Sequence, residues 1–314
     1  MPIFTIATTS EEVAAAFAEE IKGKNVLITG TSIGGIGYKA AETIARYAAL
    51  VIITGHNVER LKLSEEALKK EVSGANIRPL LLDLSSFDAV RKAADEVNAY
   101  PENIDILINN AASSICPFTL TTDGFEQQMA TDHLGPFLFT ALILPKIQAA
   151  RTSTYTPRVV NVSSGAHLWC SGIDLAEVEK PQESTYNGTQ AYAKAKSANI
   201  LAARELTRRA GGQLHAFSVC PGATPTNFVF QNSDARSYFL DSGVISENGK
   251  PSANASSLLK EIPQTSSLSW KTISQGTATM LVAAFDPSLN DKPGCHLANA
   301  VVANESVAPH SSDM

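Results

Sequence analysis

The chain has 314 residues, of which 44% are hydrophobic and 18% are charged, and its formal net charge is −6. Such a composition allows a full buried core and does not indicate disorder. The acidic balance argues against general nucleic-acid binding, because that affinity comes from clustered lysine and arginine. No apolar run exceeds seven residues, whereas a membrane-spanning helix needs ~20.

Targeting and metal-binding signals are lacking in the sequence. The first ten residues have neither the charged start nor the apolar stretch of a secretory signal. The four cysteines are widely spaced, with no C-x-x-C pair and no histidine at ligand spacing: Cys116, Cys170, Cys220 and Cys295. We therefore expect a cytoplasmic protein with reduced thiols, no membrane span and no metal site.

From the N-terminus, an amphipathic helix is predicted over 10–22, with Ser10 as its N-cap. Short β-branched runs then alternate with helical stretches. Strands are predicted at 26–29, 50–54, 77–82, 104–108, 158–162 and 214–219, and helices at 38–46, 58–71, 87–98, 124–149 and 190–210. This alternation predicts an α/β fold with a doubly wound, mostly parallel sheet of the Rossmann type.

The alternation of strands and helices does not continue into the last third of the chain. Residues 224–271 are rich in Ser, Asn, Pro and Gly, and we interpret them as an irregular substrate lid. A helix is predicted at 274–285 and a last strand at 296–303, and residues 304–314 are expected to form a loose C-terminal tail. The whole chain, 1–314, is predicted to be one domain.

A glycine-rich string follows the first predicted strand and reads Thr29-Gly30-Thr31-Ser32-Ile33-Gly34-Gly35-Ile36-Gly37. Glycine-rich strings alone mark ordinary turns. Here the string opens a helix, and that context favours a loop that holds a dinucleotide diphosphate on the helix N-terminus. The candidate cofactor-binding residues in it are Gly30, Ser32, Gly34, Gly35, Ile36 and Gly37.

The end of the second predicted strand carries His56 and Asn57 but no acid. A site that prefers NAD usually has a carboxylate there to hold the ribose 2′-hydroxyl. Its absence favours NADP, with His56 or Arg60 facing the 2′-phosphate and with NAD as the alternative. His56 could equally be an ordinary turn residue and Arg60 a solvated helix charge.

Tyr192 and Lys196 lie four residues apart on a predicted helix and therefore share one face. A nearby ammonium favours the phenolate and lowers the pKa of a tyrosine, which makes a general acid/base. The alternative is an ordinary surface pair. Ser164 follows the strand predicted at 158–162, where a parallel sheet binds its ligands, although it could simply cap a turn.

The glycine-rich string is the first of six motifs that follow one another along the chain. The other five are Asp83-Leu84, Asn109-Asn110-Ala111-Ala112, Val162-Ser163-Ser164, Tyr192-x-x-x-Lys196 and Pro221-Gly222. That order resembles the short-chain dehydrogenase/reductase family, in the branch of retinol dehydrogenases and their fungal relatives. The resemblance covers residues 23–222, and residues 275–279 add a weaker match.

The resemblance implies a role for each matching residue. Tyr192 would exchange the proton with the substrate oxygen, Lys196 would lower its pKa and hold the nicotinamide ribose, and Ser164 would hydrogen-bond the substrate oxygen. The remaining implied cofactor contacts are Asp83 and Leu84 at the adenine, Asn110 and Ala111 along the dinucleotide, and Pro221, Gly222 and Thr226 at the nicotinamide.

Three positions depart from the family pattern. One extra residue between Gly30 and Gly35 is expected to widen the phosphate turn at Gly34, and Ala112 replaces a glycine. Asp132 stands where the family has an asparagine of the catalytic tetrad, which acts mainly through its backbone carbonyl. The aspartate keeps that carbonyl and adds a charge near Lys196, unless it points away to cap a turn or pair with an arginine.

Together these features predict an NADP(H)-dependent oxidoreductase that interconverts a carbonyl and a secondary or primary alcohol on a small or medium apolar substrate. One alternative is a non-redox epimerase, dehydratase or cyclase of a biosynthetic pathway; another is a catalytically silent cofactor-binding sensor. We expect a cytoplasmic enzyme of secondary metabolism that forms a homodimer or higher homo-oligomer through the helices at 124–149 and 190–210. His133 and His167 are expected to be structural.

Overall fold

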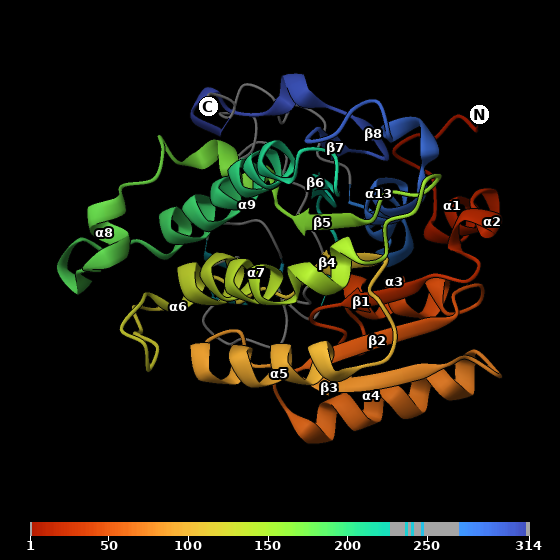
Figure 1. Cartoon of the computed structure of the whole chain (residues 1–314). Helices are drawn as coiled ribbons and strands as arrows, with labels where there is room; N and C mark the ends of the chain where they lie inside the picture. Colours follow the sequence, from red (N-terminus) through yellow and green to blue (C-terminus); the bar gives the residue numbers. More distant parts are fainter. Residues whose placement is uncertain (1, 227–235, 238–239, 242–245, 248–269, 312–314) are drawn as a thin grey trace.

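The computed structural model describes residues 2–226, 236–237, 240–241, 246–247 and 270–311. Its strands form one eight-stranded sheet in the order β3-β2-β1-β4-β5-β6-β7-β8 (Figure 1). All neighbouring pairs are parallel except the final β7–β8 pair. The strands are β1 (Asn25–Ile28), β2 (Leu50–Gly55), β3 (Ile77–Leu81), β4 (Ile106–Asn109), β5 (Arg158–Val162), β6 (His215–Cys220), β7 (His296–Ala298) and β8 (Val301–Val302).

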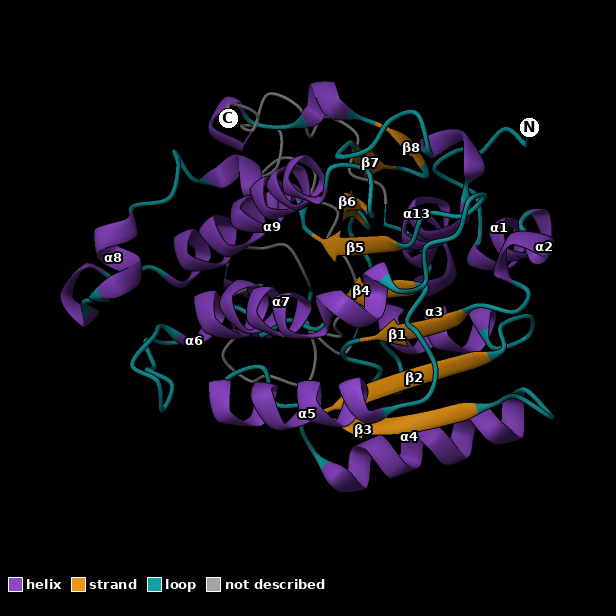
Figure 2. Cartoon of the chain, in the orientation of Figure 1, coloured by secondary structure: helices purple, strands orange, loops and turns teal. Residues whose placement is uncertain are grey.

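Helices cover both faces of the sheet (Figure 2). The core on one face joins the sheet to α1, α3, α4 and α13, and the core on the other face joins it to α5, α7 and α9. The helices are α1 (Ser10–Ala16), α2 (Ala18–Ile21), α3 (Ile36–Ile44), α4 (Val58–Glu71), α5 (Phe87–Ala99), α6 (Gln127–Met129), α7 (Gly135–Gln148), α8 (Leu175–Glu179), α9 (Gly188–Ala210) and α13 (Ile273–Phe285).

Successive side chains of each central strand pack alternately into the two cores. In β1, Leu27 packs into the core with α5, α7 and α9, whereas Val26 and Ile28 pack into the core with α3 and α13. Burial on both faces explains why the sequence of such a strand is a continuous apolar run. The predicted doubly wound, mostly parallel sheet of the Rossmann type is therefore confirmed.

The N-terminal helix differs from its prediction. Thr9, not Ser10, is the N-cap, and it forms a capping box with Glu12. The hydroxyl of Ser10 instead contacts the hydroxyls of Thr43 and Ser274. The helix breaks at Phe17, so the predicted segment 10–22 becomes the two short helices α1 and α2.

The predicted helix at 124–149 also differs. It begins only at Gln127, because the Glu126 side chain accepts the first free amides, those of Gln128 and Met129. Between α6 and α7 the chain forms a π-helical turn over Ala130–Leu134. Such a turn inserts an extra residue and is frequent at functional sites.

The C-terminal part corrects two expectations. The predicted strand at 296–303 is a hairpin of β7 and β8, turned at Asn299 and Ala300, which both have positive φ. Residues 304–311 are not loose: they form two short 3₁₀ turns and bury Val307, Ala308 and Ser311. Of the predicted lid at 224–271, residues 227–235, 238–239, 242–245 and 248–269 lie outside the described residues, as do residues 312–314 of the tail.

None of the helices in the described part of the chain has the length and apolar character that crossing a bilayer requires. The longest of them, α9, carries charged residues along its length.

Candidate active site

The motif residues gather at one edge of the sheet. Strands β1 to β7 are parallel, so their carboxyl ends lie at the same edge. The strand order reverses between β1 and β4, and ligands of doubly wound sheets bind in the crevice at that switch point. The loops after β1, β2, β4, β5 and β6 leave the sheet at this edge (Figure 1).

The turn after β1 is held against the end of β4. Gly30 has a φ of +72°, and a Cβ on it would lie 2.6 Å from the Cα of Ala111. The Asn110 amide nitrogen donates to the carbonyls of Thr29 (2.8 Å) and Gly30 (3.0 Å). Glycine is therefore required at position 30, and Asn110 and Ala111 hold the glycine turn in place.

The extra residue of this loop is accommodated in a tight turn. The Gly35 amide donates to the Ser32 carbonyl at 3.0 Å, and Gly34, the third residue of that turn, has a φ of +80°. A turn with a positive φ at its third residue favours glycine there.

The helix that follows this turn, α3, begins without a side-chain cap. Its N-cap, Gly35, offers no side-chain hydrogen bond, whereas Asn57 caps α4, Ser86 caps α5, Asn187 caps α9 and Thr272 caps α13. Uncapped first-turn amides and the positive end of the helix dipole suit an anion. The start of α3 thus fits a dinucleotide diphosphate.

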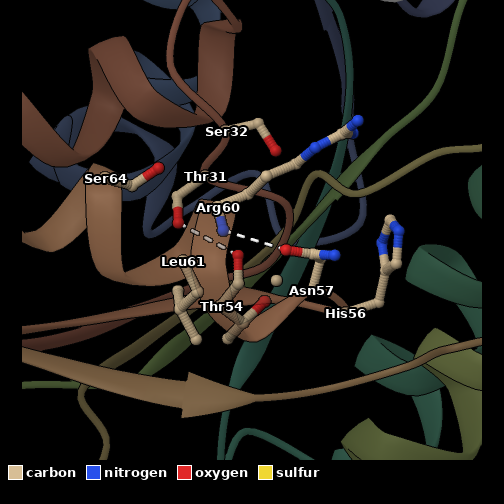
Figure 3. A pocket seen from close by; sticks show the side chains of 9 residues that line it. Thr31, Ser32, Thr54, His56, Asn57, Arg60, Leu61 and Ser64 are labelled. Carbon is tan, nitrogen blue, oxygen red and sulfur yellow. Dashed lines mark hydrogen bonds between the residues drawn. The ribbon is translucent and has the colours of Figure 1, made fainter.

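A small cleft lies beside the loop (Figure 3). In that view the side chains of His56, Asn57 and Arg60 extend toward the same side of the cleft. Asn57 Oδ1 also accepts the Arg60 amide at 2.9 Å as the N-cap of α4. None of the described residues that line it is acidic; they are Thr31, Ser32, Thr54, Gly55, His56, Asn57, Arg60, Leu61 and Ser64.

Asp83 and Leu84 follow β3 next to this cleft, since the Leu82 amide donates to the Gly55 carbonyl at 3.0 Å. The Asp83 carboxylate accepts the Ser85 amide (2.9 Å) and hydroxyl (2.6 Å). The carboxylate of Asp83 therefore stabilises its own turn.

The structure brings Ser164, Tyr192 and Lys196 together. Ser164 lies just beyond the end of β5, and its hydroxyl accepts the Ala166 amide at 3.2 Å and is hydrogen-bonded to Tyr192. Lys196 Nζ lies 5.2 Å from the centroid of the Tyr192 ring. The Ser163 hydroxyl donates to the Lys196 carbonyl (2.7 Å) and so joins the end of β5 to α9.

Asp132, in the π-helical turn, points toward this group. Its Oδ2 lies 3.1 Å from Lys196 Nζ, and the two side chains are 0% and 2% exposed. Its Oδ1 accepts the Ser113 amide at 2.6 Å, and its backbone carbonyl accepts the Asn199 amide nitrogen at 3.0 Å. The alternatives in which Asp132 points away from Lys196 or pairs with an arginine are therefore wrong.

Burial and the neighbouring opposite charges shift the pKa values of these groups in opposite directions. Burial raises the pKa of Asp132 to about 6, against the effect of Lys196 and the Ser113 amide. Burial disfavours the Lys196 ammonium, but the charges of Asp132 and Tyr192 outweigh that effect and raise its pKa. Burial also raises the pKa of Tyr192, and Lys196 counteracts it. The lysine therefore opposes the rise in the Tyr192 pKa, and the charge of Asp132 adds to that rise.

The loop after β6 carries Pro221 and Gly222 to the same edge of the sheet, and Thr226 follows with its amide donating to Thr224 (2.9 Å). Lys271 packs across Gly222: a Cβ on this glycine would lie 3.1 Å from Lys271 Nζ. Lys271 is only 4% exposed, and burial lowers its pKa. Its ammonium is a second buried cation at the predicted nicotinamide end.

Sequence reasoning missed Lys271, Ser113 and Asn199. None of them belongs to a local motif, and each reaches the site through a contact with a residue distant in the chain. The two histidines expected to be structural do make hydrogen bonds: His133 Nδ1 lies 3.0 Å from Asn199 Oδ1, and His167 Nδ1 lies 2.7 Å from the Ser164 carbonyl.

Known proteins share this sequence pattern. The family described as short chain dehydrogenase matches residues 24–171. Short-chain dehydrogenase TIC 32 A, chloroplastic, of Brassica napus is 34% identical over 96% of this chain and 87% of its own length. Oxidoreductase fscI of Fusarium equiseti is 33% identical over 70% of this chain and 95% of its own length. Human retinol dehydrogenase 13 is 36% identical over 61% and 56% of the two lengths.

Solved structures share the fold. NAD⁺-bound xylitol dehydrogenase superposes with a TM-score of 0.63 at 20% identity, over 88% of this chain and 98% of that one. A putative short chain dehydrogenase from Escherichia coli CFT073, complexed with NADPH, gives a TM-score of 0.59 at 19% identity, over 90% and 99%. The chain belongs to the short-chain dehydrogenase/reductase family, as its motifs predicted, and is an oxidoreductase acting on CH–OH groups with NAD(P).

Proposed function

We propose that the chain is an NADP(H)-dependent oxidoreductase that interconverts a carbonyl and a secondary or primary alcohol, with Tyr192 as the acid/base. The observation that carries the proposal is the arrangement of Tyr192 between Ser164 and Lys196 at the carboxyl edge of the sheet. The nicotinamide supplies or takes the hydride when it is bound. The protein supplies orientation and proton transfer.

Each catalytic side chain then has one task. The Ser164 hydroxyl, held by the Ala166 amide, orients the substrate oxygen. The Tyr192 hydroxyl gives a proton to that oxygen during reduction and removes it during oxidation. The Lys196 ammonium offsets the effect of burial on the Tyr192 pKa. Asp132 pairs with the same ammonium at 3.1 Å.

The preference for NADP(H) is supported by the cleft in Figure 3. His56 and Arg60 line it, no acid does, and a guanidinium is a favoured partner of phosphate. NAD(H) is the alternative cofactor. Gly30, Gly34, Gly35 and the first turn of α3 would hold the diphosphate.

The substrate is proposed to be apolar and of small or medium size. We further propose a cytoplasmic enzyme of secondary metabolism that works as a homodimer or higher homo-oligomer through α7 and α9.

The test is a panel of ketones and aldehydes with NADPH or NADH, followed through the absorbance of the reduced nicotinamide. Reduction of apolar carbonyls with a higher kcat/KM for NADPH supports the proposal. The buried Asp132–Lys196 pair, unusual for the family, is the observation that favours a non-redox reaction on the same scaffold. Tight NADPH binding without oxidation by any carbonyl compound would favour that reaction or a cofactor-binding sensor.

A further inference from the structure

We propose that His167 is a positioning residue for Ser164 and that the C-terminal segment, residues 304–311, holds His167 in place. The inference rests on the proposed function of Ser164. It assigns the end of the chain a part in the active site, although these residues lie far from the motifs in the sequence.

His167 lies in the 3₁₀ turn Gly165–Trp169, directly after Ser164. The Ser164 carbonyl lies 2.7 Å from its ring Nδ1 and also accepts the His167 amide at 3.1 Å. A carbonyl only accepts hydrogen bonds, so Nδ1 must carry a proton. The backbone of Ser164 is thus held by two donors from one residue.

The other ring nitrogen faces the C-terminal segment. The Ala308 amide donates to His167 Nε2 at 3.3 Å, and the Ser306 backbone also approaches the ring. An amide only donates, so the bond from Ala308 needs an unprotonated Nε2, and we infer the neutral Nδ1–H tautomer, although the Ser306 backbone acts in the opposite direction and raises the pKa of the ring. The His167 side chain is 2% exposed, and burial lowers its pKa, which favours that neutral form.

Two further contacts join the same segment to the site. His310 Nε2 lies 3.4 Å from the thiol of Cys170, which ends the turn that His167 occupies. The Ser311 hydroxyl is hydrogen-bonded to the hydroxyl of Ser197, the neighbour of Lys196 on α9. Figure 1 shows the C-terminal end lying over α9. The segment therefore contacts both elements that carry the catalytic side chains.

The segment is itself anchored. Val307 and Ala308 are 8% and 5% exposed, and the Asn304 side chain accepts the amide of His296, the first residue of β7. The sheet thus positions the segment, the segment positions the imidazole ring, and the ring positions the Ser164 backbone. A small displacement of a group that orients the substrate can cost up to 10²-fold in rate.

Two variants of His167 separate the two hydrogen bonds. In His167→Gln the side-chain amide reaches the position of Nε2, so the contact with the C-terminal segment is kept and the bond to the Ser164 carbonyl is lost. In His167→Asn the amide reaches the position of Nδ1, so the bond to Ser164 is kept and the contact with the segment is lost. We expect kcat to fall about tenfold or more in the glutamine variant and about threefold in the asparagine variant.

The segment is tested by Ala308→Pro, which removes the amide donor. The residue before it, Val307, has a φ of −85° and a ψ of 132°, which a following proline tolerates. We expect a fall of about threefold in kcat. Glu305→Ala, an exposed position of the same segment, is the matched control and should leave kcat unchanged.

Two readouts separate positioning from general destabilisation. The dissociation constant of NADPH, measured by fluorescence, and the melting temperature should stay close to the wild-type values in all four variants. A wild-type kcat in the glutamine variant would overturn the role of His167, and a wild-type kcat in Ala308→Pro would overturn the role of the segment. Equal losses in the asparagine and glutamine variants would also overturn the proposal.

A failure of the proposed function is distinguishable from a failure of this inference. If the wild-type protein turns over no carbonyl compound, the proposed function fails. The histidine ring ¹⁵N chemical shifts then test the inference alone: His167 should be a neutral Nδ1–H tautomer in the wild type, and its Nε2 shift should change in Ala308→Pro, because that nitrogen loses its hydrogen-bond donor. A protonated ring in the wild type, or an unchanged Nε2 shift in the variant, would overturn the inference.

Discussion

Lys196 and Asp132 form an ion pair of 3.1 Å in which the side chains are 2% and 0% exposed. Lys196 lies on α9, and Asp132 lies in the π-helical turn before α7. A negative charge so close to the ammonium raises the lysine pKa and also opposes ionisation of Tyr192. An asparagine at position 132 would lack that charge.

Asp132→Asn should therefore shift the pH dependence of kcat toward lower pH. Removing the carboxylate removes a charge that raises the pKa of Tyr192, so the group that controls kcat should titrate about one unit lower. The pH–rate profiles of the two proteins, measured side by side, check this. The variant should keep the fold and bind NADPH as the wild type does; an unchanged profile or a shift to higher pH would contradict the electrostatic argument.

Tyr192→Phe should abolish turnover and leave the dissociation constant of NADPH nearly unchanged, because only the ionisable hydroxyl is lost. Lys196→Met should differ by weakening NADPH binding as well, since the lysine is expected to hold the nicotinamide ribose. Single-turnover assays and fluorescence titration check both variants. Retained turnover in Tyr192→Phe would exclude this residue as the proton donor.

Arg60→Ala should weaken NADPH binding about tenfold, a loss of ~1.4 kcal/mol, and leave NADH binding unchanged. The reason is that Arg60 lines the cleft, where none of the described lining residues is acidic. Lys62→Ala is a suitable control, because Lys62 lies on the same helix and does not line the cleft. A wild-type enzyme that prefers NADH would refute the expected cofactor preference.

Arg158→Met should lower the free energy of unfolding by about 2–4 kcal/mol. Arg158 is 4% exposed, and its guanidinium donates to the carbonyls of Ala283 (3.0 Å) and Asp286 (2.9 Å) at the end of α13. The variant leaves these buried acceptors without their donor. Urea unfolding measures the loss.

The control for Arg158 is Arg78→Met. Arg78 makes two hydrogen bonds, both to Glu102, but the side chains of this pair are 30% and 31% exposed. Exposed ion pairs contribute only ~0–1 kcal/mol, so this variant should unfold nearly as the wild type does. Equal effects of the two substitutions would show that burial does not decide how much the free energy of unfolding falls.

The protein should sediment as a dimer or larger oligomer at micromolar concentration, and Phe137→Glu should convert it to a monomer. Phe137 is 60% exposed on α7, one of the two helices expected to pair. Leu63→Glu, at a position 56% exposed on α4, is the matched control and should not change the association state. A monomeric wild type would contradict the prediction.

The sequence by itself determined the order of strands and helices and the motifs along them. Hydrophobic periodicity reports burial directly, so the strand at 158–162 and the helix at 58–71 have the predicted bounds. Tyr192 and Lys196 could be paired because four residues along a helix define a common face. Each of these inferences depends on short-range geometry, which the local sequence encodes.

Only the tertiary structure decided which distant groups meet. The sequence allows Asp132 to point toward or away from Lys196, and the π-helical turn directs it toward Lys196. Lys271 reaches Gly222, and Ala308 reaches His167, through packing that no local pattern records. The polar composition of residues 304–314 predicts a loose tail, yet Val307 and Ala308 are buried and the end of the tail contacts α9. Such contacts depend on the relative placement of whole elements, which the packing of the two cores decides.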